Sequence, residues 1–525
     1  MDLTVIAGTG AEHPGPGATG ATHPTPIVPG TRRARTATVI EGPGLLADEA
    51  VLESFEMGAA GLDLAAPPVV LPDFHHKRKM EMPSSIAVAT RGTIRPTFTS
   101  SSVNCGMALI ALGTDKPADH AVDAFYRAVK EKYPYPTRGA RELTASEVVA
   151  AATDGAQFAA ERWGVDAEEL ERIEESGRVD LEPWGGGARL RKEIPALTWQ
   201  LARLRFGTVG PTNHFVELQQ VEEILDPEAA ELLGIRQGQL TLQYHAGGGV
   251  LTGEIGHLFQ RRKDTARAMK AVMAVQKPLY HLATARSAAQ LRERMRLYFA
   301  KGCAPVDLDS DEGQRLMLAN ASAMNYGYAF RVATYAALRR LALDAFGGEP
   351  GRLVVDSPHN SIYEENVGGQ RAVVHRHNSC RAFPADRMPE GSVFATTGQA
   401  VLLPGTHRTS SYLAVAGARS SDSLHSACHG AGTVIEQFEK DGRSTLDPGG
   451  RSTRRYRYTD EAPSSAPHLD DHGVNAAMSV LTRHGIVRPV ARMRPFAVLH
   501  CPPPPPDRAG SLLHVSAPDP SRSRP

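Results

Sequence analysis

The middle of the chain contains the stretch Gly207-Thr208-Val209-Gly210-Pro211-Thr212-Asn213-His214-Phe215-Val216-Glu217, which sets an amide, an imidazole and a carboxylate close together. Other short motifs place a cysteine or a histidine beside glycine or asparagine: Val103-Asn104-Cys105-Gly106-Met107, Tyr244-His245-Ala246-Gly247-Gly248-Gly249, Asp356-Ser357-Pro358-His359-Asn360 and Cys428-His429-Gly430-Ala431-Gly432. Glycine beside a potential ligand lets the backbone and a cofactor approach closely. A thiolate with several imidazoles suits a borderline or soft divalent ion, such as Mn, Zn, Co or Fe, better than Mg or Ca.

Each of these motifs is a weak signal by itself. A lone histidine is more often a hydrogen-bonded structural residue than a ligand, and a lone buried cysteine usually serves packing. Neither a C-x-x-C nor an H-E-x-x-H spacing occurs in the sequence. Spacing alone therefore leaves two interpretations open, a metalloenzyme and a set of ordinary structural residues.

The bulk composition limits the kinds of partner that the chain can have. Lys and Arg together number 58, as do Asp and Glu, so the formal net charge is zero and broad binding to nucleic acid is not favoured. RNA contacts would have to come from local basic runs, each of which is more simply a solvated surface: 75–79, 261–263 and 454–458. The five cysteines are widely spread, which argues against a disulfide framework. Without an evident signal sequence or long apolar run, the expectation is a cytoplasmic protein with no membrane span.

Local patterns predict a mixed α+β fold rather than a doubly wound sheet, because strands and helices interleave with no fixed period. Short β-branched runs predict buried strands at 86–90, 353–355, 372–374 and 401–403. Helices are predicted after the capping box Thr144-Ala145-Ser146-Glu147 and over 264–276, 287–300 and 313–346, the last of them stopped by Gly347. Residues 1–40 are expected to be a flexible extension, 41–500 the catalytic domain and 501–525 a Pro-rich disordered tail.

Taken in order, the motifs resemble the RtcB family of RNA ligases. The resemblance also includes Leu71-Pro72-Asp73-Phe74-His75, Val374-His375-Arg376 with Arg381-Ala382-Phe383-Pro384, and Arg494-Pro495, so it runs from about Leu71 to His500. The N-H-F-x-E and C-H-G-A-G elements are specific, and the whole set in the family's order is very improbable by chance. The resemblance implies a single large domain of mixed sheets surrounded by helices.

The resemblance also implies roles for individual residues. Cys105, His245 and His359 would bind one manganese ion, and Cys105 with His214 would bind a second ion, with the thiolate bridging. His429 would attack the α-phosphate of GTP. Asn213 and Glu217 would contact the guanylate, Glu217 at the guanine edge, and Ser411 or Ser410 would contact the nucleotide. Gly430 and Gly432 would leave room for it beside His429.

In the implied reaction, His429 takes GMP from GTP and passes it to an RNA 3′-phosphate, which is first opened from a 2′,3′-cyclic phosphate where necessary. A 5′-hydroxyl then attacks and GMP leaves. The expected partners are RNA ends, GTP and an archease-like activator, as in RNA repair and tRNA splicing, and the expected state is a monomer.

Several positions depart from the family's pattern. Ser102 replaces a metal-binding aspartate, and a neutral hydroxyl is a poorer ligand than a carboxylate, so the second metal is expected to bind weakly. Gly249 and Thr433 replace arginines, whose guanidinium groups can bind one phosphate through two hydrogen bonds. His377 and His500 replace lysines. The segments 76–80 and 405–412 also differ from the family's glycine-rich and G-S-M-G-T-A-S-Y elements.

These departures leave three functional hypotheses. The first is RNA end joining. The second is a guanylyltransferase that caps 3′-phosphate ends with GMP without joining them. The third is an inert RNA- or nucleotide-binding relative, against which the retained metal-and-nucleophile cluster argues. The remaining histidines and aromatic residues are expected to be structural, core or surface residues: His75, His281, His375, His484, Phe215 and Tyr244.

Overall fold

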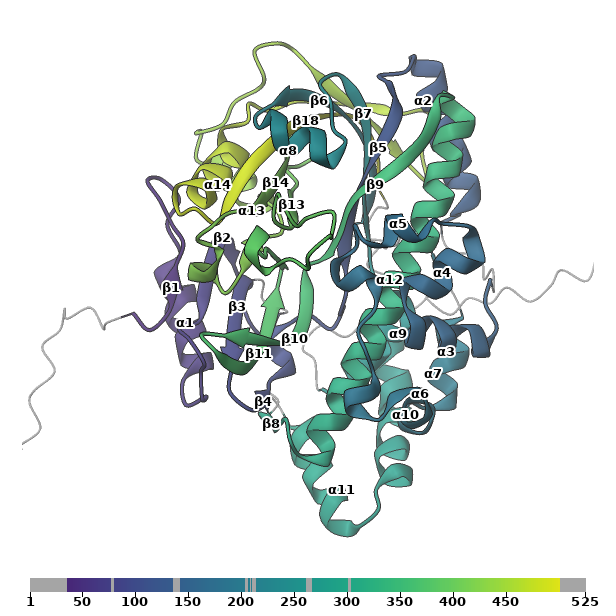
Figure 1. Cartoon of the computed structure of the whole chain (residues 1–525), viewed down its shortest axis with the longest axis vertical. Coiled ribbons are helices and arrows are strands. Elements are labelled where there is room, and N and C mark those ends of the chain that lie inside the picture. Colours follow the sequence, from purple (N-terminus) through teal and green to yellow (C-terminus); the bar gives the residue numbers. More distant parts are fainter. Residues whose placement is uncertain are drawn as a thin grey trace, which may run out of the picture. The chain divides into compact units, whose positions relative to one another are not determined.

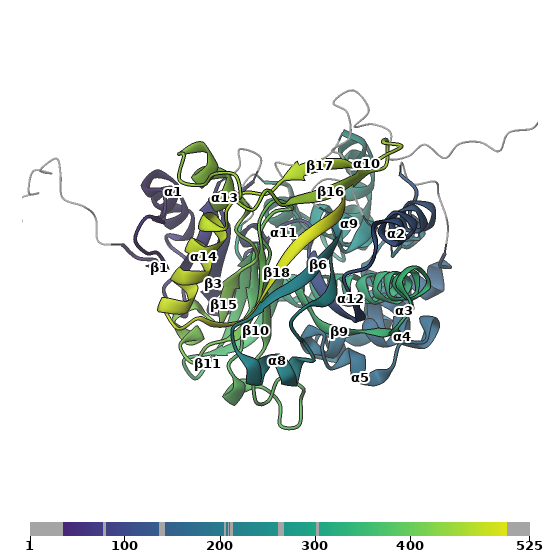
Figure 2. The same ribbon diagram turned by 90° about the horizontal axis from the view of Figure 1, so that it is seen from above.

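The computed structural model describes residues 35–76, 80–135, 142–203, 206–207, 209, 214–260, 267–300 and 304–500. From Thr36 onward, the described elements belong to one unit. Its largest sheet follows the order β13-β14-β18-β6-β7-β5-β9, with β16 and β17 attached beside β18. Every pairing in this sheet is antiparallel except that of β16 with β18. Figure 2 shows β18 and β6 crossing the middle of the view.

The strands of the large sheet have the following bounds: β5 (Gly106–Asp115), β6 (Phe215–Ile224), β7 (Gln239–Ala246), β9 (Glu349–Pro358), β13 (Ala400–Leu403), β14 (Ser411–Ala416), β16 (Ser452–Arg457), β17 (Ser464–Pro467) and β18 (Val487–His500). Strands β5 and β7 are apolar or buried along most of their length, as expected for strands covered on both faces. The ends of these buried strands can therefore hold functional groups in defined positions.

A second sheet has the order β1-β2-β3-β11-β10. Its strands are β1 (Thr38–Val39), β2 (Val69–His75), β3 (Ser84–Thr90), β11 (Gln370–His377) and β10 (Asn360–Val367). Two small pairs complete the strands: β12 (Ser379–Arg381) with β15 (Ser426–Cys428), and β4 (Thr93–Ile94) with β8 (Val306–Asp307). The predicted strands at 86–90, 353–355, 372–374 and 401–403 are confirmed.

The long helix α12 (Asp311–Phe346) packs against α2 (Asp119–Lys132), α3 (Ala145–Asp154), α4 (Ala156–Trp163) and α9 (Gly249–Leu258) (Figure 1). Ser310 caps its first turn by accepting from the Gly313 amide, and Gly347 ends it with a φ of 68°. Glycine adopts that left-handed conformation without the steric cost of a Cβ. The predicted capping box at Thr144 and Glu147 is also present.

The other helices are α1 (Glu49–Ala59), α5 (Ala167–Leu170), α6 (Gly186–Glu193), α7 (Ala196–Ala202), α8 (Pro227–Leu233), α10 (Arg267–Thr284), α11 (Ala288–Arg294), α13 (Gly432–Lys440) and α14 (His472–Arg483). A π-helical turn at Met295–Phe299 continues α11. The interleaved sheets and helices confirm the predicted α+β class. Among the described residues, no helix is both long and apolar enough to cross a membrane.

Candidate metal centre

Cys105 lies in a tight turn directly before β5. Asn104 has a φ of 56°, and the Cys105 amide donates to the Ser102 carbonyl at 3.2 Å. The Cys105 carbonyl in turn accepts from the His359 amide at 2.9 Å. Because β5 pairs with β9, with Gly106 opposite Pro358, Cys105 and His359 come together at the same end of the large sheet.

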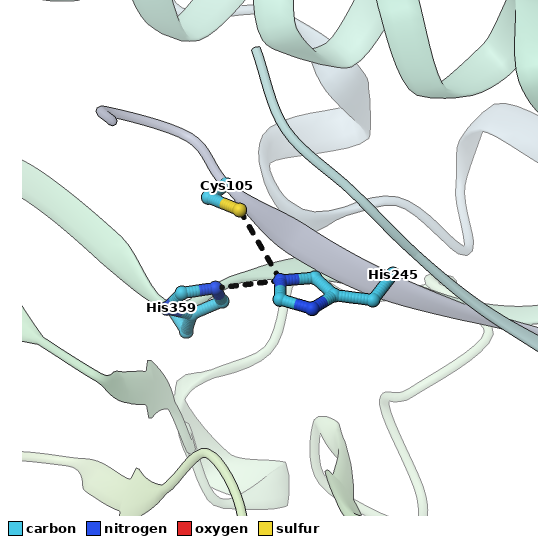
Figure 3. A group of neighbouring side chains, drawn as sticks. All are labelled: Cys105, His245 and His359. Carbon is cyan, nitrogen blue, oxygen red and sulfur yellow. Dashed lines mark hydrogen bonds between the residues drawn. The ribbon is translucent and has the colours of Figure 1, made fainter. Parts of the chain in front are cut away.

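His245 completes a group of three donor side chains. It lies opposite Met107 in the pairing of β5 with β7. Its Nε2 is 3.2 Å from the Cys105 Sγ and 3.1 Å from the His359 Nε2, and Figure 3 shows the three side chains converging. One ligand atom from each residue lies within 4.8 Å of the others, and all three residues are buried. A thiol facing two imidazole nitrogens at this spacing fits a divalent cation of borderline softness.

His214 adds a fourth donor directly before β6. Its Nε2 lies 3.4 Å from the Cys105 Sγ, and its ring meets that of His245 edge-on with centroids 4.8 Å apart. The Cys105 Sγ therefore lies within 3.4 Å of a ring nitrogen of both His245 and His214. Phe215, expected to be a core residue, also contacts the His245 ring edge-on at 5.9 Å.

The His429 ring stacks on that of His359. It follows β15 directly, and its amide donates to the Asn378 carbonyl at 3.2 Å. Its ring lies parallel to the His359 ring, with centroids 3.6 Å apart and planes inclined by 22°. The centroid of the His245 ring is 5.4 Å away. The predicted nucleophile and the predicted ligands thus share one site.

Burial fixes the protonation states of these side chains. It lowers the pKa of His359 and of His429 well below the ordinary value, and the neighbouring imidazoles lower it further. Both rings are therefore neutral at physiological pH, which is the form that binds metals and acts as a nucleophile. Burial also raises the pKa of the Cys105 thiol to about 11, although the Arg331 charge opposes this effect.

An ion pair supports the turn that carries Cys105. The Arg331 guanidinium on α12 binds Asp356 on β9 through contacts of 2.7 and 2.8 Å and also donates to the Asn104 carbonyl. Both side chains of the pair are almost fully buried. Breaking a buried pair leaves one charge uncompensated in a medium of low polarity.

We expect Asp356→Asn to lower the free energy of unfolding by about 3–5 kcal/mol, because it leaves the buried Arg331 charge without its counter-ion. Urea unfolding of the purified protein measures this change. The matched control is Asp422→Asn, since Asp422 binds Arg419 at 2.7 Å in a pair that is largely exposed and should contribute less than about 1 kcal/mol. Equal effects of the two substitutions would contradict a supporting role for the buried pair.

Gly247 leaves room for two of the predicted ligands. A Cβ at this position would lie 3.0 Å from the His214 Cε1 and 3.6 Å from the Cys105 Sγ. We expect Gly247→Ala to displace the His214 ring and to weaken divalent-metal binding by about tenfold, as loss of ligand positioning does elsewhere. Metal titration of the purified protein measures it. Gly253→Ala on α9 is the matched control, because a Cβ there meets nothing within 4 Å; equal affinities in the two variants would exclude this packing effect.

A second polar group lies along β6, β7 and β14. The Gln219 Nε2 donates to the Glu217 Oε1 at 2.7 Å, to the Gln243 Oε1 at 3.1 Å and to the Ser411 Oγ at 3.2 Å. This arrangement joins Glu217 to Ser411, two of the predicted nucleotide contacts. Ser410 points elsewhere, since its hydroxyl donates to Asp471 at 2.7 Å. Burial raises the pKa of Glu217 to about 8, and the Gln219 amide lowers it slightly.

The C-terminal end of β2 reaches the segment that follows His429. Asp73 has a φ of 65°, and its carboxylate accepts from the Val434 amide at 3.0 Å in the first turn of α13. The Thr433 hydroxyl and the His75 Nδ1 lie 3.1 Å apart. His75 was expected to be structural or surface, and Asp73 was given no role; the Leu71–His75 motif contained the signal, but only the fold shows that it supports the His429 segment.

The remaining predicted positions are placed as follows. A Cβ at Gly430 would meet its nearest neighbour, the Pro404 carbonyl, at 3.5 Å, and one at Gly432 would meet nothing within 4 Å, so both leave space beside His429. The His377 Nδ1 is 2.9 Å from the Pro83 carbonyl oxygen. The His500 ring lies edge-on to His407 at 5.2 Å. Asn213, Cys303, Cys501 and the basic residues 77–79 and 261–263 lie outside the described residues.

Comparison with known proteins identifies the family. Residues 59–501 match the model of the family described as tRNA-splicing ligase RtcB. The chain is 31% identical over 358 residues to the RNA-splicing ligase RtcB of Mycobacterium tuberculosis, covering 66% of this chain and 74% of that relative. It is 27% identical over 460 residues to the tRNA-splicing ligase RtcB of Thermococcus kodakarensis, covering 82% of this chain and 86% of that relative.

The match to the tRNA-splicing ligase RtcB of Pyrococcus abyssi is 29% identical over 421 residues and covers 75% of this chain. The chain spans only 39–44% of the length of that relative and of those from Pyrococcus horikoshii and Pyrococcus furiosus. The family match nevertheless extends over most of the sequence and includes the cysteine and the histidines that meet in the structure. This chain belongs to the RtcB family.

Proposed function

We propose that this chain is a GTP-dependent RNA ligase that joins an RNA 3′-phosphate or 2′,3′-cyclic phosphate to a 5′-hydroxyl. The observation that carries the proposal is the stacking of His429 on His359, with ring centroids 3.6 Å apart, beside the Cys105–His245 pair. A neutral imidazole next to a cation-binding cluster is suited to accepting a phosphoryl group.

Cys105, His245 and His359 would hold one divalent cation, for which manganese is our proposal, and Cys105 with His214 would hold a second. Such a cation, when bound, neutralises phosphate charge during the displacement. Ser102 contributes its carbonyl to the Cys105 turn and supplies no carboxylate, so the second position should bind more weakly than the first.

His429 would carry the covalent step. Its unprotonated ring nitrogen attacks the α-phosphorus of GTP, forming a phosphorus–nitrogen bond while the bond to pyrophosphate breaks. The GMP then moves to an oxygen of the RNA 3′-phosphate, which breaks the phosphorus–nitrogen bond and restores the free imidazole. Attack by the 5′-hydroxyl on the RNA phosphorus expels GMP and completes the joint.

Glu217, Gln219 and Ser411 would bind the nucleotide together with Asn213. Glu217 is buried and its partner, Gln219, is an amide that also reaches Ser411. A carboxylate in this position can accept from the N–H groups at the guanine edge, and Gly430 and Gly432 leave open space beside His429 for the phosphates. An archease-like activator is a further partner that this proposal implies.

GTP affinity is expected to increase with pH because Glu217 must lose a proton to accept from guanine. The pKa of its carboxyl is about 8, so the acid is protonated at neutral pH. Affinity should rise nearly tenfold per pH unit from pH 6.5 towards 8 and then level off. Titration with a fluorescent GTP analogue measures it. Glu217→Gln should bind more weakly and without this pH dependence; a persistent slope in that variant would assign the titration to another group.

Two candidate reactions remain separable by experiment. Gly249 at the start of α9 and Thr433 at the start of α13 stand where the family has arginines, and neither can bind a phosphate by charge. This observation favours an enzyme that caps a 3′-phosphate with GMP and stops. The test incubates RNA that has a 3′-phosphate with GTP, manganese and an acceptor RNA that has a 5′-hydroxyl. Joining gives a longer RNA product, whereas capping alone gives an RNA with GMP on its 3′ end.

A further inference from the structure

Helix α10 buries several polar side chains, beside the core residues Met273 and Tyr280, and exposes apolar ones. The Lys277 Nζ donates to the carbonyls of His257, Gln260 and Tyr298 at 2.6–2.8 Å. Gln276 donates to the Thr198 hydroxyl at 2.8 Å, and the His281 Nε2 is 2.9 Å from the Leu258 carbonyl oxygen. A surface helix ordinarily buries its apolar side and exposes its polar side.

The opposite face of α10 is exposed and entirely apolar over more than three turns. Val275, Leu279 and Leu282 are exposed by 63%, 60% and 59%. They are spaced four and three residues apart, so they lie on one side of the helix. Between residues 271 and 283, the exposed residues are Ala271, Ala274, Val275, Pro278, Leu279, Leu282 and Ala283. We call this set the α10 face.

Pro278 gives the α10 face an unusual polar feature. Proline has no amide hydrogen, so the carbonyl of Ala274, four residues earlier, lacks its helical donor. Both residues belong to the exposed side. The helix directs a proline and leucines towards solvent, and a lysine and a glutamine towards the interior. This arrangement is explained when another apolar surface covers the outer face.

Positive charges flank the α10 face in the sequence. Lys270 precedes it, and Arg286 in the turn to α11, Arg292 on α11 and Arg296 in the π-helical turn follow it; all four are exposed. None of these four side chains forms an ion pair with an acidic side chain that the structure describes, and Glu293 is the only exposed acidic residue between 267 and 300. The rim of a complementary surface would therefore be acidic.

We propose that α10 is a docking helix, which inserts Val275, Leu279 and Leu282 into an apolar, acid-rimmed groove of a different protein. Anchors at this spacing are the pattern by which an amphipathic helix occupies a hydrophobic groove. The helix lies beside the first turns of α12 (Figure 1), where the Tyr280 hydroxyl bonds Arg315. This inference does not depend on the ligase activity.

A second copy of this chain fits the α10 face less well. The face is roughly 20 Å long and 10 Å wide by helix geometry, which gives a flat footprint far below the roughly 800 Å² per partner of a stable interface. A groove that encloses the helix on three sides contacts more of it. A two-fold pairing would also bring the basic ends of two copies together, because Lys270 and Arg286 carry the same charge.

The test places a photoreactive benzoylphenylalanine at position 279 of the full chain in cells that naturally contain it. Position 232 is the matched control, because Leu232 on α8 is exposed by 47% and lies outside the α10 face. We expect a single protein adduct from position 279 and none from position 232. The adduct is identified by mass spectrometry, and the purified partner is then titrated against the purified chain.

Binding of that purified partner should weaken at least tenfold in Leu279→Glu, in Lys270→Glu combined with Arg286→Glu, and at high salt. The single variant Leu279→Gln should lose binding while keeping the melting temperature and the ligase activity, because residue 279 is exposed and contributes no side chain to the candidate metal centre. The proposal would be overturned by the absence of an adduct, by an adduct of twice the chain's mass or by an adduct with RNA. Equal labelling from positions 279 and 232, or partner binding that charge reversal does not weaken, would also overturn it.

Discussion

His429→Ala is expected to abolish covalent labelling of the protein by GTP. With radiolabelled GTP and manganese, the wild type should form an acid-labile GMP adduct, since the neutral His429 ring lies against His359 beside the candidate cation-binding cluster. Removing the nucleophile should lower the rate of adduct formation by more than about a thousandfold. Denaturing gel electrophoresis of the labelled protein measures it.

The variant must remain folded for this result to be informative. Its metal content and melting temperature should stay close to those of the wild type, because the other ring contacts of the cluster persist: His214 with His245 and His245 with His359. His484→Ala is a matched control outside the cluster, since the His484 Nε2 lies 2.9 Å from the Glu41 carbonyl oxygen, and labelling should be unaffected. An adduct that survives in folded His429→Ala would assign the covalent step to another residue.

A wild-type protein that binds metal and GTP yet forms no adduct would have a different meaning. The substitutions at Ser102, Gly249 and Thr433 would then have abolished the chemistry of the family, and the inert nucleotide-binding hypothesis would replace the ligase. An adduct that transfers GMP to RNA without joining would support the capping reaction. The labelling experiment and the joining experiment together therefore separate the three hypotheses.

Cys105→Ser is expected to remove most of the divalent metal from the protein. The thiol lies 3.2 Å from the His245 Nε2 and 3.4 Å from the His214 Nε2, so a single substitution affects both proposed cation positions. Loss of an outer partner of a metal ligand already costs 10–100-fold in affinity, and loss of a direct ligand should cost at least on the order of 100-fold. Metal analysis after dialysis against manganese measures the change.

Cobalt substitution provides a second measurement of the same change. A cobalt–thiolate bond gives a charge-transfer absorption that should be present in the wild type and absent in Cys105→Ser. Cys380→Ser is the control, because Cys380 is also buried but its Sγ donates to the Ala427 carbonyl at 3.6 Å and belongs to a hydrophobic cluster outside the candidate site. Equal metal content in the two variants, or a charge-transfer band that remains in Cys105→Ser, would contradict the assignment of Cys105 as a ligand.

The sequence by itself determined the class of fold, the family and the cysteine and histidines that meet in the candidate site. Local periodicity is sufficient for elements such as α12, whose Gly347 stop and Ser310 cap depend on neighbouring residues only. The motifs containing Cys105, His245, His359 and His429 were recognisable because each is short and continuous. These motifs together supply a soft thiol and several imidazoles, and this chemistry is also evident from the sequence alone.

Only the tertiary structure decided which of these motifs meet and what supports them. The distance between Cys105 and His359 depends on the register of β5 against β9. Ser411 on β14 bonds Gln219, whereas Ser410, directly before β14, bonds Asp471. The Asp73 carboxylate accepts from the Val434 amide near His429, although Asp73 and Val434 are 361 positions apart in the sequence. The exposure of the α10 face depends on which side of the helix packs against the rest of the protein. These features arise from long-range packing, which no local window of sequence contains.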